Sequence, residues 1–483
     1  MSLKNNTLFL ALSNSVNVSV TFILSIALAR YFESKDIYGK FQQLYMIIPF
    51  FIALTSGIPL ALSYYHGRYL KFTDRIFIHR RFFILMIIAT LISAIIIVLC
   101  RNYLSSLFNN EYFVIYAILF GIILFFKVLN TYFINYTLIS NQIRTYFIIT
   151  IFSFFIFSGF IWLIFHLSLS IKQILIGVIA QEVLKGIIFF SISYRRLILP
   201  KMNTTWLVRK GEILYILPLT GVALMNIGNL FVDKYMIAGM LDAKAFADYQ
   251  VGAFTVPFIG IITGSIVTAL LPVFSKLNIE GNNLEIIRTW RKATSKATLL
   301  LLPIFIYSIG FGTHIITFFY GEQYEIAGTI FRLYSLRFLF SVVLFSLTMS
   351  AIGLQNWIAI NSLINFLLNA TLNFFMIKSY GVFGAVFATI ISTYVGMIYP
   401  IYLIKRQIGA GFLDYFPLKD YLIILGISLL LVLIFILSFH YFKLSDVFPI
   451  VFSPVYYMIC LAIGVKAIYG YKLNLLSLIQ RIY

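Results

Sequence analysis

The chain has 483 residues, of which 61% are hydrophobic and only 11% are charged, and its formal net charge is +20 at pH 7. Soluble globular proteins have about 25% charged residues. This composition therefore excludes a soluble domain and predicts an all-α membrane protein that crosses the bilayer many times. The two cysteines, Cys100 and Cys460, both lie in apolar runs and indicate neither a disulfide framework nor a metal site.

Long apolar runs predict the membrane spans, because a helix needs about 20 mostly apolar residues to cross the bilayer core. The first run is too long for the core of a signal peptide and lacks a convincing cleavage site, so it is expected to be an uncleaved span. Fourteen spans are predicted: 8–30, 44–66, 82–100, 113–138, 146–166, 171–194, 213–239, 249–273, 297–319, 326–352, 357–378, 382–404, 420–440 and 447–468.

The 36 lysine and arginine residues predict the orientation. Most of them fall in every second segment between the predicted spans, and basic residues mark cytoplasmic loops. Both termini are therefore expected in the cytoplasm. The basic excess is then a topology signal combined with attraction to anionic lipids, so we expect membrane lipids and no nucleic acid as partners.

Short loops and missing motifs exclude several classes of function. No segment between spans is long enough for a sizeable soluble domain, and the sequence has neither GxxxxGK[ST] nor HExxH. These absences argue against an ATP-driven pump in one chain and against a zinc protease. No cofactor and no metal are expected. The five histidines are scattered near the ends of predicted spans, and no ligand cluster is expected among them.

An internal repeat predicts two similar halves. PFFIALTSGIPLAL (49–62) and PFIGIITGSIVTAL (257–270) share six of fourteen residues at a fixed offset. Six predicted spans separate the copies, so both halves would run in the same direction. We expect a six-helix lobe over 1–200, a second over 201–410, and helices 13 and 14 with a cytoplasmic tail over 411–483. Chance similarity between apolar helices is the alternative. Two lobes of this kind suit alternating access.

Charged side chains inside predicted spans are candidates for a binding site, because they usually face a bundle interior or a water-filled cavity. Lys127 lies near the middle of the fourth span, and Asn130 shares its helix face. A structural ion pair with a neighbouring helix is the alternative for Lys127. Glu182 and Lys185 lie three residues apart in the sixth span, where they form either a self-satisfied pair or a substrate or proton site.

The seventh span carries a polar stripe. Asn226, Asn229 and Asp233 follow one another at spacings of three and four residues, and Lys234 is adjacent. The stripe is expected to face the interface between lobes, with snorkelling of Lys234 to the headgroups as the alternative.

The second half offers two arginines and a row of asparagines. Arg332 and Arg337 lie in the outer half of the tenth span. A guanidinium suits phosphate because it binds in a bidentate manner, and an interfacial anchor is the alternative, preferred for Arg332. Asparagines recur every fourth residue at 361, 365, 369 and 373, which favours helix packing over substrate contact.

Three stretches together resemble a known family. LARYFESKDIYGKFQ (28–42), FVDKYMIAGMLDAKAFADYQ (231–250) and the asparagine-rich stretch 351–392 resemble, in this order and spacing, polysaccharide transporters of the multidrug/oligosaccharidyl-lipid/polysaccharide flippase superfamily. Ala247 stands where glycine is usual in that family. Ser379 and Tyr380 stand where a proline-bearing turn is frequent.

The resemblance implies a flippase rather than an enzyme. Such a protein moves an undecaprenyl-pyrophosphate-linked oligosaccharide, an O-antigen or capsule repeat unit, across the bacterial cytoplasmic membrane. A polysaccharide polymerase and a chain-length regulator are candidate partners. The motifs carry over only Arg30, Asp233 and Lys234 as functional positions. Lys127, Lys185 and Arg337 are added because of their depth, and Arg332 is a further cation in or near the presumed cavity.

Two alternatives remain open at this point. A cation-coupled multidrug exporter of the same superfamily would favour buried acids in the first lobe, whereas bases outnumber acids within the predicted spans. A membrane polysaccharide polymerase would need a large outer loop with catalytic residues, and the longest outer loops here are short.

Overall fold

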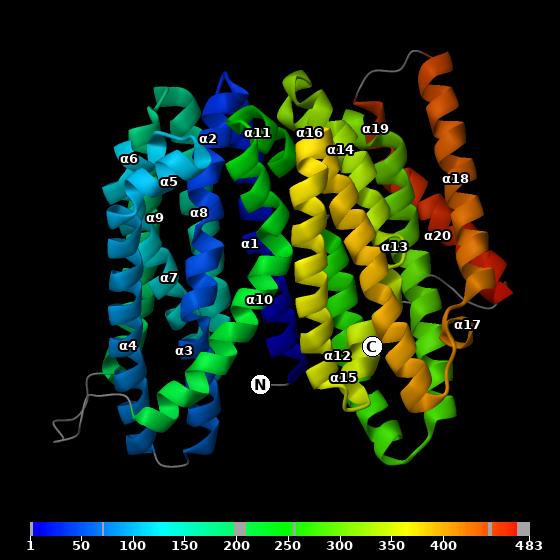
Figure 1. The fold of residues 1–483 in the computed structure, drawn as a ribbon, viewed down its shortest axis with the longest axis horizontal. Helices are drawn as coiled ribbons and strands as arrows, with labels where there is room; N and C mark the ends of the chain where they lie inside the picture. Colours follow the sequence, from blue (N-terminus) through cyan, green and yellow to red (C-terminus); the bar gives the residue numbers. More distant parts are fainter. Residues whose placement is uncertain (1–2, 70–71, 198–208, 255–256, 443–446, 471–483) are drawn as a thin grey trace. The chain divides into compact units, whose positions relative to one another are not determined.

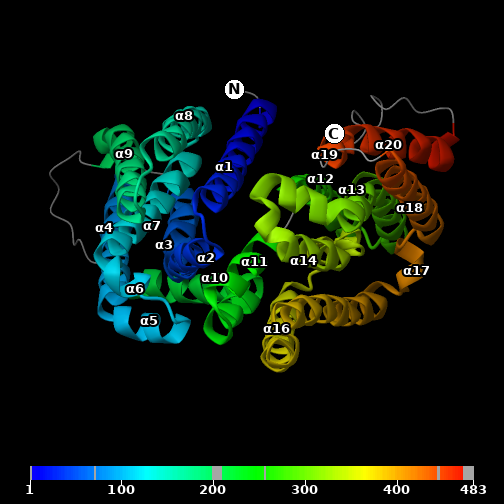
Figure 2. The same cartoon turned by 90° about the horizontal axis from the view of Figure 1, so that it is seen from above.

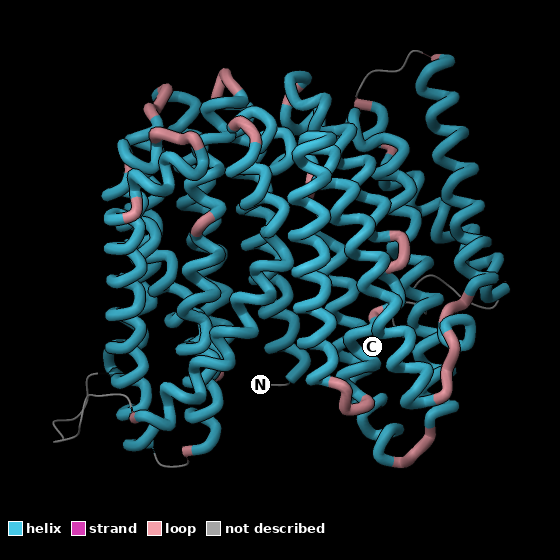
Figure 3. Tube along the Cα trace, viewed as in Figure 1, coloured by secondary structure: helices cyan, strands magenta, loops and turns pink. Residues whose placement is uncertain are grey.

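The computed structural model describes residues 3–69, 72–197, 209–254, 257–442 and 447–470. Within these ranges nearly every residue is helical and none is in a strand (Figure 3). Twelve of the described helical segments are long and apolar enough to cross a membrane. The protein is therefore an all-α, multi-pass membrane protein, as the composition predicts. The predicted number of fourteen spans is not confirmed.

The chain divides into two compact units, Met1–Ala247 and Asp248–Tyr483. The lobe boundary predicted between residues 200 and 201 falls in 198–208, outside the described residues. Most of the predicted cytoplasmic tail, 471–483, also lies outside them.

Unit 1 contains the first ten helices, and α11 begins in it and ends in unit 2 (Figure 1). Their bounds are α1 (Leu3–Tyr31), α2 (Lys35–Met46), α3 (Ile48–Arg68), α4 (Phe72–Leu99), α5 (Arg101–Phe108), α6 (Tyr112–Ile115), α7 (Ala117–Ile139), α8 (Ile143–Leu167), α9 (Ile171–Leu197), α10 (Lys210–Met240) and α11 (Ala243–Gly252).

The helices α3, α4, α7 and α9 form one cluster in unit 1, seen end-on in Figure 2. The helix α10 packs against α3. The two helices approach closely because α3 has a glycine, Gly57, where they cross. A Cβ atom at Gly57 would lie 2.5 Å from the carbonyl oxygen of Ile216 and 2.2 Å from the Thr220 hydroxyl. Small residues at such crossings let membrane helices approach backbone to backbone.

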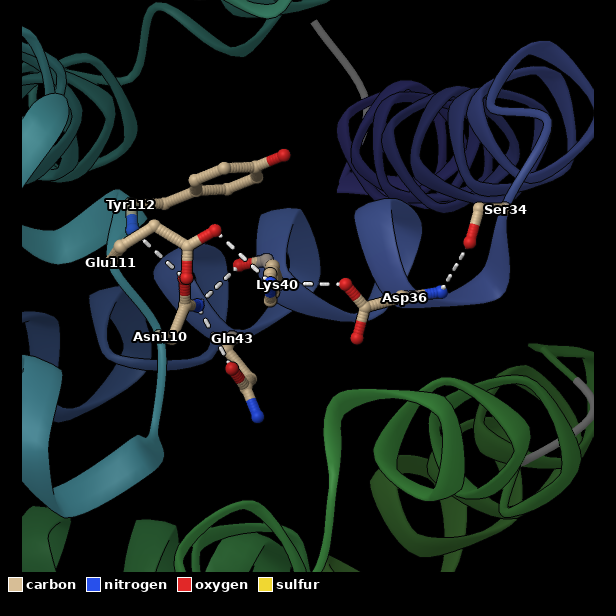
Figure 4. A network of polar contacts seen from close by, with 7 residues as sticks. All are labelled: Ser34, Asp36, Lys40, Gln43, Asn110, Glu111 and Tyr112. Atoms are coloured by element: carbon tan, nitrogen blue, oxygen red, sulfur yellow. Dashed lines mark hydrogen bonds and ion pairs between the residues drawn. The ribbon is translucent and has the colours of Figure 1, made fainter.

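A polar network ties α2 to the segment before α6 (Figure 4). The Lys40 ammonium lies 3.0 Å from carboxylate oxygens of both Asp36 and Glu111. The Asn110 amide donates to the carbonyl of Lys40 at 2.9 Å and to the side-chain oxygen of Gln43 at 2.8 Å. Because Asn110 is 1% exposed, these hydrogen bonds hold α2 firmly at this end of unit 1.

Unit 2 contains the remaining helices and three short 3₁₀ segments. Their bounds are α12 (Pro257–Ile279), α13 (Asn283–Tyr320), η1 (Glu322–Tyr324), α14 (Glu325–Ser335), η2 (Leu336–Phe338), η3 (Ser341–Val343), α15 (Phe345–Ala351), α16 (Gln355–Ile408), α17 (Phe412–Tyr415), α18 (Leu418–Tyr441), α19 (Phe448–Val451) and α20 (Ser453–Tyr469). The 38-residue α13 is the central helix and packs against α12, α14, α18 and α20.

The tenth predicted span, 326–352, is not one continuous helix, which corrects the expectation. It is broken between α14 and α15, and Leu344 has a left-handed backbone with φ +54°. Side-chain donors bind the carbonyls that the break frees. Trp290 donates to Val343 at 2.6 Å, and the Tyr394 hydroxyl donates to Leu336. Non-helical backbone at membrane depth is tolerated only where other protein groups or water satisfy it.

The eleventh and twelfth predicted spans form one element, α16, with a sharp break at Gly381. Its φ of +57° and ψ of −137° suit only glycine. The two arms of α16 pack together, because a Cβ atom at Gly396 would lie 2.0 Å from the Asn365 side chain. Asn373 donates to Asn369 within the first arm. These contacts support the packing role that the sequence favours for the asparagine row.

The two repeat copies have the same local structure. The first begins at the start of α3 and follows the short helix α2, whereas the second begins at the start of α12 and follows the short helix α11. Pro49 lies at the beginning of α3, and Pro257 begins α12. This likeness supports the repeat, while the division into six-helix lobes stays a prediction.

Candidate functional site

A buried carboxylate organises the polar centre of unit 1. Glu182 of α9 is 6% exposed. The Asn130 amide of α7 donates to its Oε2 at 2.9 Å and to its main-chain carbonyl at 3.0 Å. The Lys185 ammonium lies 3.6 Å from Glu182 Oε1. The structure therefore brings together three predicted site residues from two helices that are distant in sequence.

Lys127 adds a second positive charge to this centre. Its ammonium lies 5.4 Å from the centre of the Tyr45 ring, which belongs to α2, a cation–π geometry. It interacts electrostatically with Glu182, but it forms no ion pair within 4.0 Å in the part of the chain that the structure describes. We call Tyr45, Lys127, Asn130, Glu182 and Lys185 the α7–α9 centre. With two ammonium groups and one carboxylate, it has excess positive charge.

The polar residues of α10 lie in different environments. Asp233 is 3% exposed, and its carboxylate accepts a hydrogen bond from the Lys234 amide at 2.8 Å. The Lys234 ammonium lies 5.4 Å from the Phe231 ring centre. Asn226 is exposed, whereas Asn229 is half-buried and donates to the Met225 carbonyl at 3.1 Å. Binding roles for these residues stay predictions.

Three arginines complete the predicted set. Arg30 is exposed in the last turn of α1. In unit 2, Arg332 is exposed at the end of α14 and donates to the Ile309 carbonyl at 2.8 Å. Arg337 lies in the break of the tenth span and stacks on Tyr334 and Phe338, with its guanidinium carbon 4.7 Å and 5.0 Å from the ring centres.

Sequence reasoning missed two pairs at the end of unit 1 where α3 ends and α4 begins. His66 Nδ1 and His79 Nε2 lie 2.9 Å apart, although no histidine cluster was expected. Their spacing of thirteen residues, between the end of the second predicted span and the start of the third, was the available signal. Arg81 forms a buried ion pair with Glu212 at 3.1 Å. Among the described residues, no group of three or more metal-binding side chains is found.

Solved structures with the same fold are membrane transporters. The lipid II flippase MurJ in an inward closed conformation has a TM-score of 0.73 at 17% identity, over 96% of this chain and 99% of that chain. An inward-facing MATE family multidrug transporter of the MOP superfamily has a TM-score of 0.58 at 16% identity, over 84% and 96%. A MOP superfamily transporter from Pyrococcus furiosus has a TM-score of 0.54 at 15% identity, over 84% and 96%. These similarities show a shared fold.

The family assignment comes from the sequence. No curated protein sequence matches the chain. The sequence profile of the family described as "Polysaccharide biosynthesis protein" matches residues 28–328, which is more than half of the chain. The chain therefore belongs to the polysaccharide biosynthesis protein family, within the fold of the MOP superfamily transporters.

Proposed function

We propose that this protein is a flippase that moves undecaprenyl-pyrophosphate-linked oligosaccharide repeat units of an O-antigen or capsule across the bacterial cytoplasmic membrane. Its two termini would face the cytoplasm. The substrate would cross by alternating access, without a covalent step. The family and the likeness to MurJ, a lipid II flippase, support this class of substrate. A polysaccharide polymerase and a chain-length regulator are its proposed partners.

The observation that carries the proposal is the excess positive charge of the α7–α9 centre. Glu182 is already satisfied by Asn130 and Lys185, so the ammonium group of Lys127 is not neutralised by a close carboxylate. An unneutralised cation inside a membrane domain costs free energy. A transiently bound anion would offset that cost, and a pyrophosphate linker is such an anion.

The remaining predicted residues have proposed supporting roles. Lys185 and Lys127 would contact the pyrophosphate, and Glu182, which accepts a hydrogen bond from Asn130, would hold the Lys185 ammonium in place. Arg30, Lys234, Arg332 and Arg337 are proposed as further cationic contacts along the transport path. Asn226, Asn229 and Asp233 are proposed as polar contacts for the sugar or for a coupling ion.

A cation-coupled multidrug exporter is the second candidate. The likeness to MATE transporters and the buried acid Glu182 favour it. In that role, Glu182 would exchange a cation rather than anchor lysines, and substrate transport would depend on an ion gradient.

Deletion and complementation separate these functions. The gene would be deleted in its host, and surface polymer and lipid-linked repeat units would be measured. A flippase requires loss of surface polymer with repeat units accumulating on the cytoplasmic side, both restored by the wild-type gene. Single repeat units that reach the surface unpolymerised would instead identify a polymerase. Normal polymer with altered drug sensitivity would establish the exporter and overturn the proposal.

A further inference from the structure

A separate cavity lies at the end of unit 1 where α3 ends and α4 begins. It has a volume of about 250 Å³, far more than a single water needs and just below the usual range of small-molecule sites. The residues that line it with polar groups are His66, Arg75, His79, Tyr136, Ser140 and Asn141. They come from α3, α4, α7 and the turn that follows α7. We call this cavity the histidine pocket.

Among the described residues, the lining of the histidine pocket is rich in hydrogen-bond donors and contains no carboxylate. Arg75 carries a permanent positive charge. Its Nε donates to the Tyr69 carbonyl at 2.7 Å, and its two terminal amino groups have no hydrogen-bond partner among the described residues. A guanidinium with free terminal amino groups is suited to bidentate binding of a phosphate. The buried carboxylate of Glu212 is paired with Arg81 and does not line the pocket.

The histidine pair leaves one nitrogen unsatisfied. The rings share a single hydrogen between His66 Nδ1 and His79 Nε2, 2.9 Å apart. His79 is 4% exposed, and its Nδ1 is buried without a hydrogen-bond partner in the described structure. A buried polar atom without a partner costs about 1–3 kcal/mol. If His66 is the donor, then His79 Nδ1 carries a hydrogen that has no acceptor among the described residues.

Tyrosines at the same end indicate the depth of the histidine pocket. Tyr64 stacks on Tyr215 with ring centres 4.5 Å apart, and Tyr65 stacks on Tyr69 at 6.4 Å. The exposed Arg68 donates to the Tyr64 hydroxyl at 3.3 Å. Tyrosine rings gather where a membrane protein crosses the lipid headgroups. The pocket is therefore expected to open at the level of lipid phosphates.

We infer that the histidine pocket binds the phosphate of an anionic membrane lipid, with Arg75 and His79 as the principal donors. The inference does not depend on the proposed transport function, since it concerns a different set of residues and a resident lipid. A bound phosphate would pair with the terminal amino groups of Arg75 and supply an acceptor beside the histidine pair. It would also link the ends of α3, α4 and α7.

The test measures lipid binding by the purified full-length protein, without any transport step. Its melting temperature would be followed in detergent during titration with short-chain phosphatidylglycerol, short-chain phosphatidylcholine and inorganic phosphate. Native mass spectrometry would count the lipids retained. We expect phosphatidylglycerol to raise the melting temperature at concentrations where the zwitterionic lipid and inorganic phosphate do not. The midpoint of this effect should shift about tenfold or more in Arg75→Gln and His79→Gln, because a charge-assisted hydrogen bond is lost.

Arg144→Gln is the matched control, since Arg144 is an exposed arginine that does not line the pocket. It should bind phosphatidylglycerol like the wild type. An equal shift in Arg144→Gln, or no shift in Arg75→Gln, overturns the inference. Stabilisation by inorganic phosphate as strong as that by the lipid would make the ligand a soluble phosphate and overturn the lipid assignment. If His79→Gln does not fold, the test still rests on Arg75→Gln, because Arg75 is only half-buried and its replacement is expected to be tolerated.

Discussion

The side-chain amide of Asn130 donates both to the carboxylate of Glu182, at 2.9 Å, and to its main-chain carbonyl, at 3.0 Å. One side chain thus fixes α7 against α9 and orients the carboxylate next to Lys185. Because both acceptors belong to the same residue, sliding of α9 along α7 would break both hydrogen bonds together. The contact between Asn130 and Glu182 therefore fixes the position of α9 along α7.

We predict that Asn130→Leu lowers the free energy of unfolding by about 1–2 kcal/mol, because the buried carboxylate loses its neutral donor. Thermal unfolding in detergent measures this change. The control is Thr131→Val, since the Thr131 hydroxyl donates to the Val128 carbonyl, one turn back in the same helix. A loss as large in Thr131→Val as in Asn130→Leu would show that Asn130 has no special role in the contact.

The charge of Lys127 is predicted to be required for transport. Lys127→Gln should reduce surface polymer about tenfold or more, because the substrate loses a charge-assisted contact, while the amount of protein in the membrane stays normal. Lys127→Arg keeps the charge and should retain part of the activity. Lys172→Gln, at an exposed position near the start of α9, should behave like wild type. Wild-type polymer levels in Lys127→Gln would remove Lys127 from the site.

The spans could be predicted because the bilayer fixes the length of an apolar helix, as for α4 and α18. The break in the tenth span could not be predicted in this way. Its residues are as apolar as those of a continuous helix, and the groups that stabilise the break, Trp290 and Tyr394, lie about fifty residues away in either direction. Hydropathy reports on composition, whereas the break depends on distant hydrogen-bond donors.

Depth and charge identified the candidate residues in the sequence, but they did not predict which residues contact one another across helices. The position of Lys127 in the middle of a span made it a candidate, and the spacing of Glu182 and Lys185 predicted their pairing. The contact between Asn130 and Glu182 joins residues 52 positions apart, which helical periodicity does not reach. The histidine pair was missed for the same reason, since two separate spans must meet before His66 and His79 become neighbours.

The crossing of α3 and α10 is predicted to tolerate no side chain at Gly57. In Gly57→Ala, the new methyl group would lie 2.5 Å from the Ile216 carbonyl oxygen, so α10 must move. We expect a loss of about 1–3 kcal/mol in the free energy of unfolding, as for other overpacked sites. Gly221→Ala on α10 is the control, because nothing lies within 4 Å of its Cβ position. Equal melting temperatures for both variants would contradict a tight crossing.

The broken tenth span is predicted to depend on the indole N–H of Trp290. Trp290→Phe removes the hydrogen bond to the Val343 carbonyl but keeps an aromatic ring against Tyr415, on which Trp290 stacks at 3.9 Å. The freed carbonyl is then left without this donor, so unfolding should become easier by about 1–3 kcal/mol. Trp357→Phe, at a position that is 41% exposed, should change the melting temperature little. If both variants melt alike, the break is held by the backbone of α14 and α15 and not by Trp290.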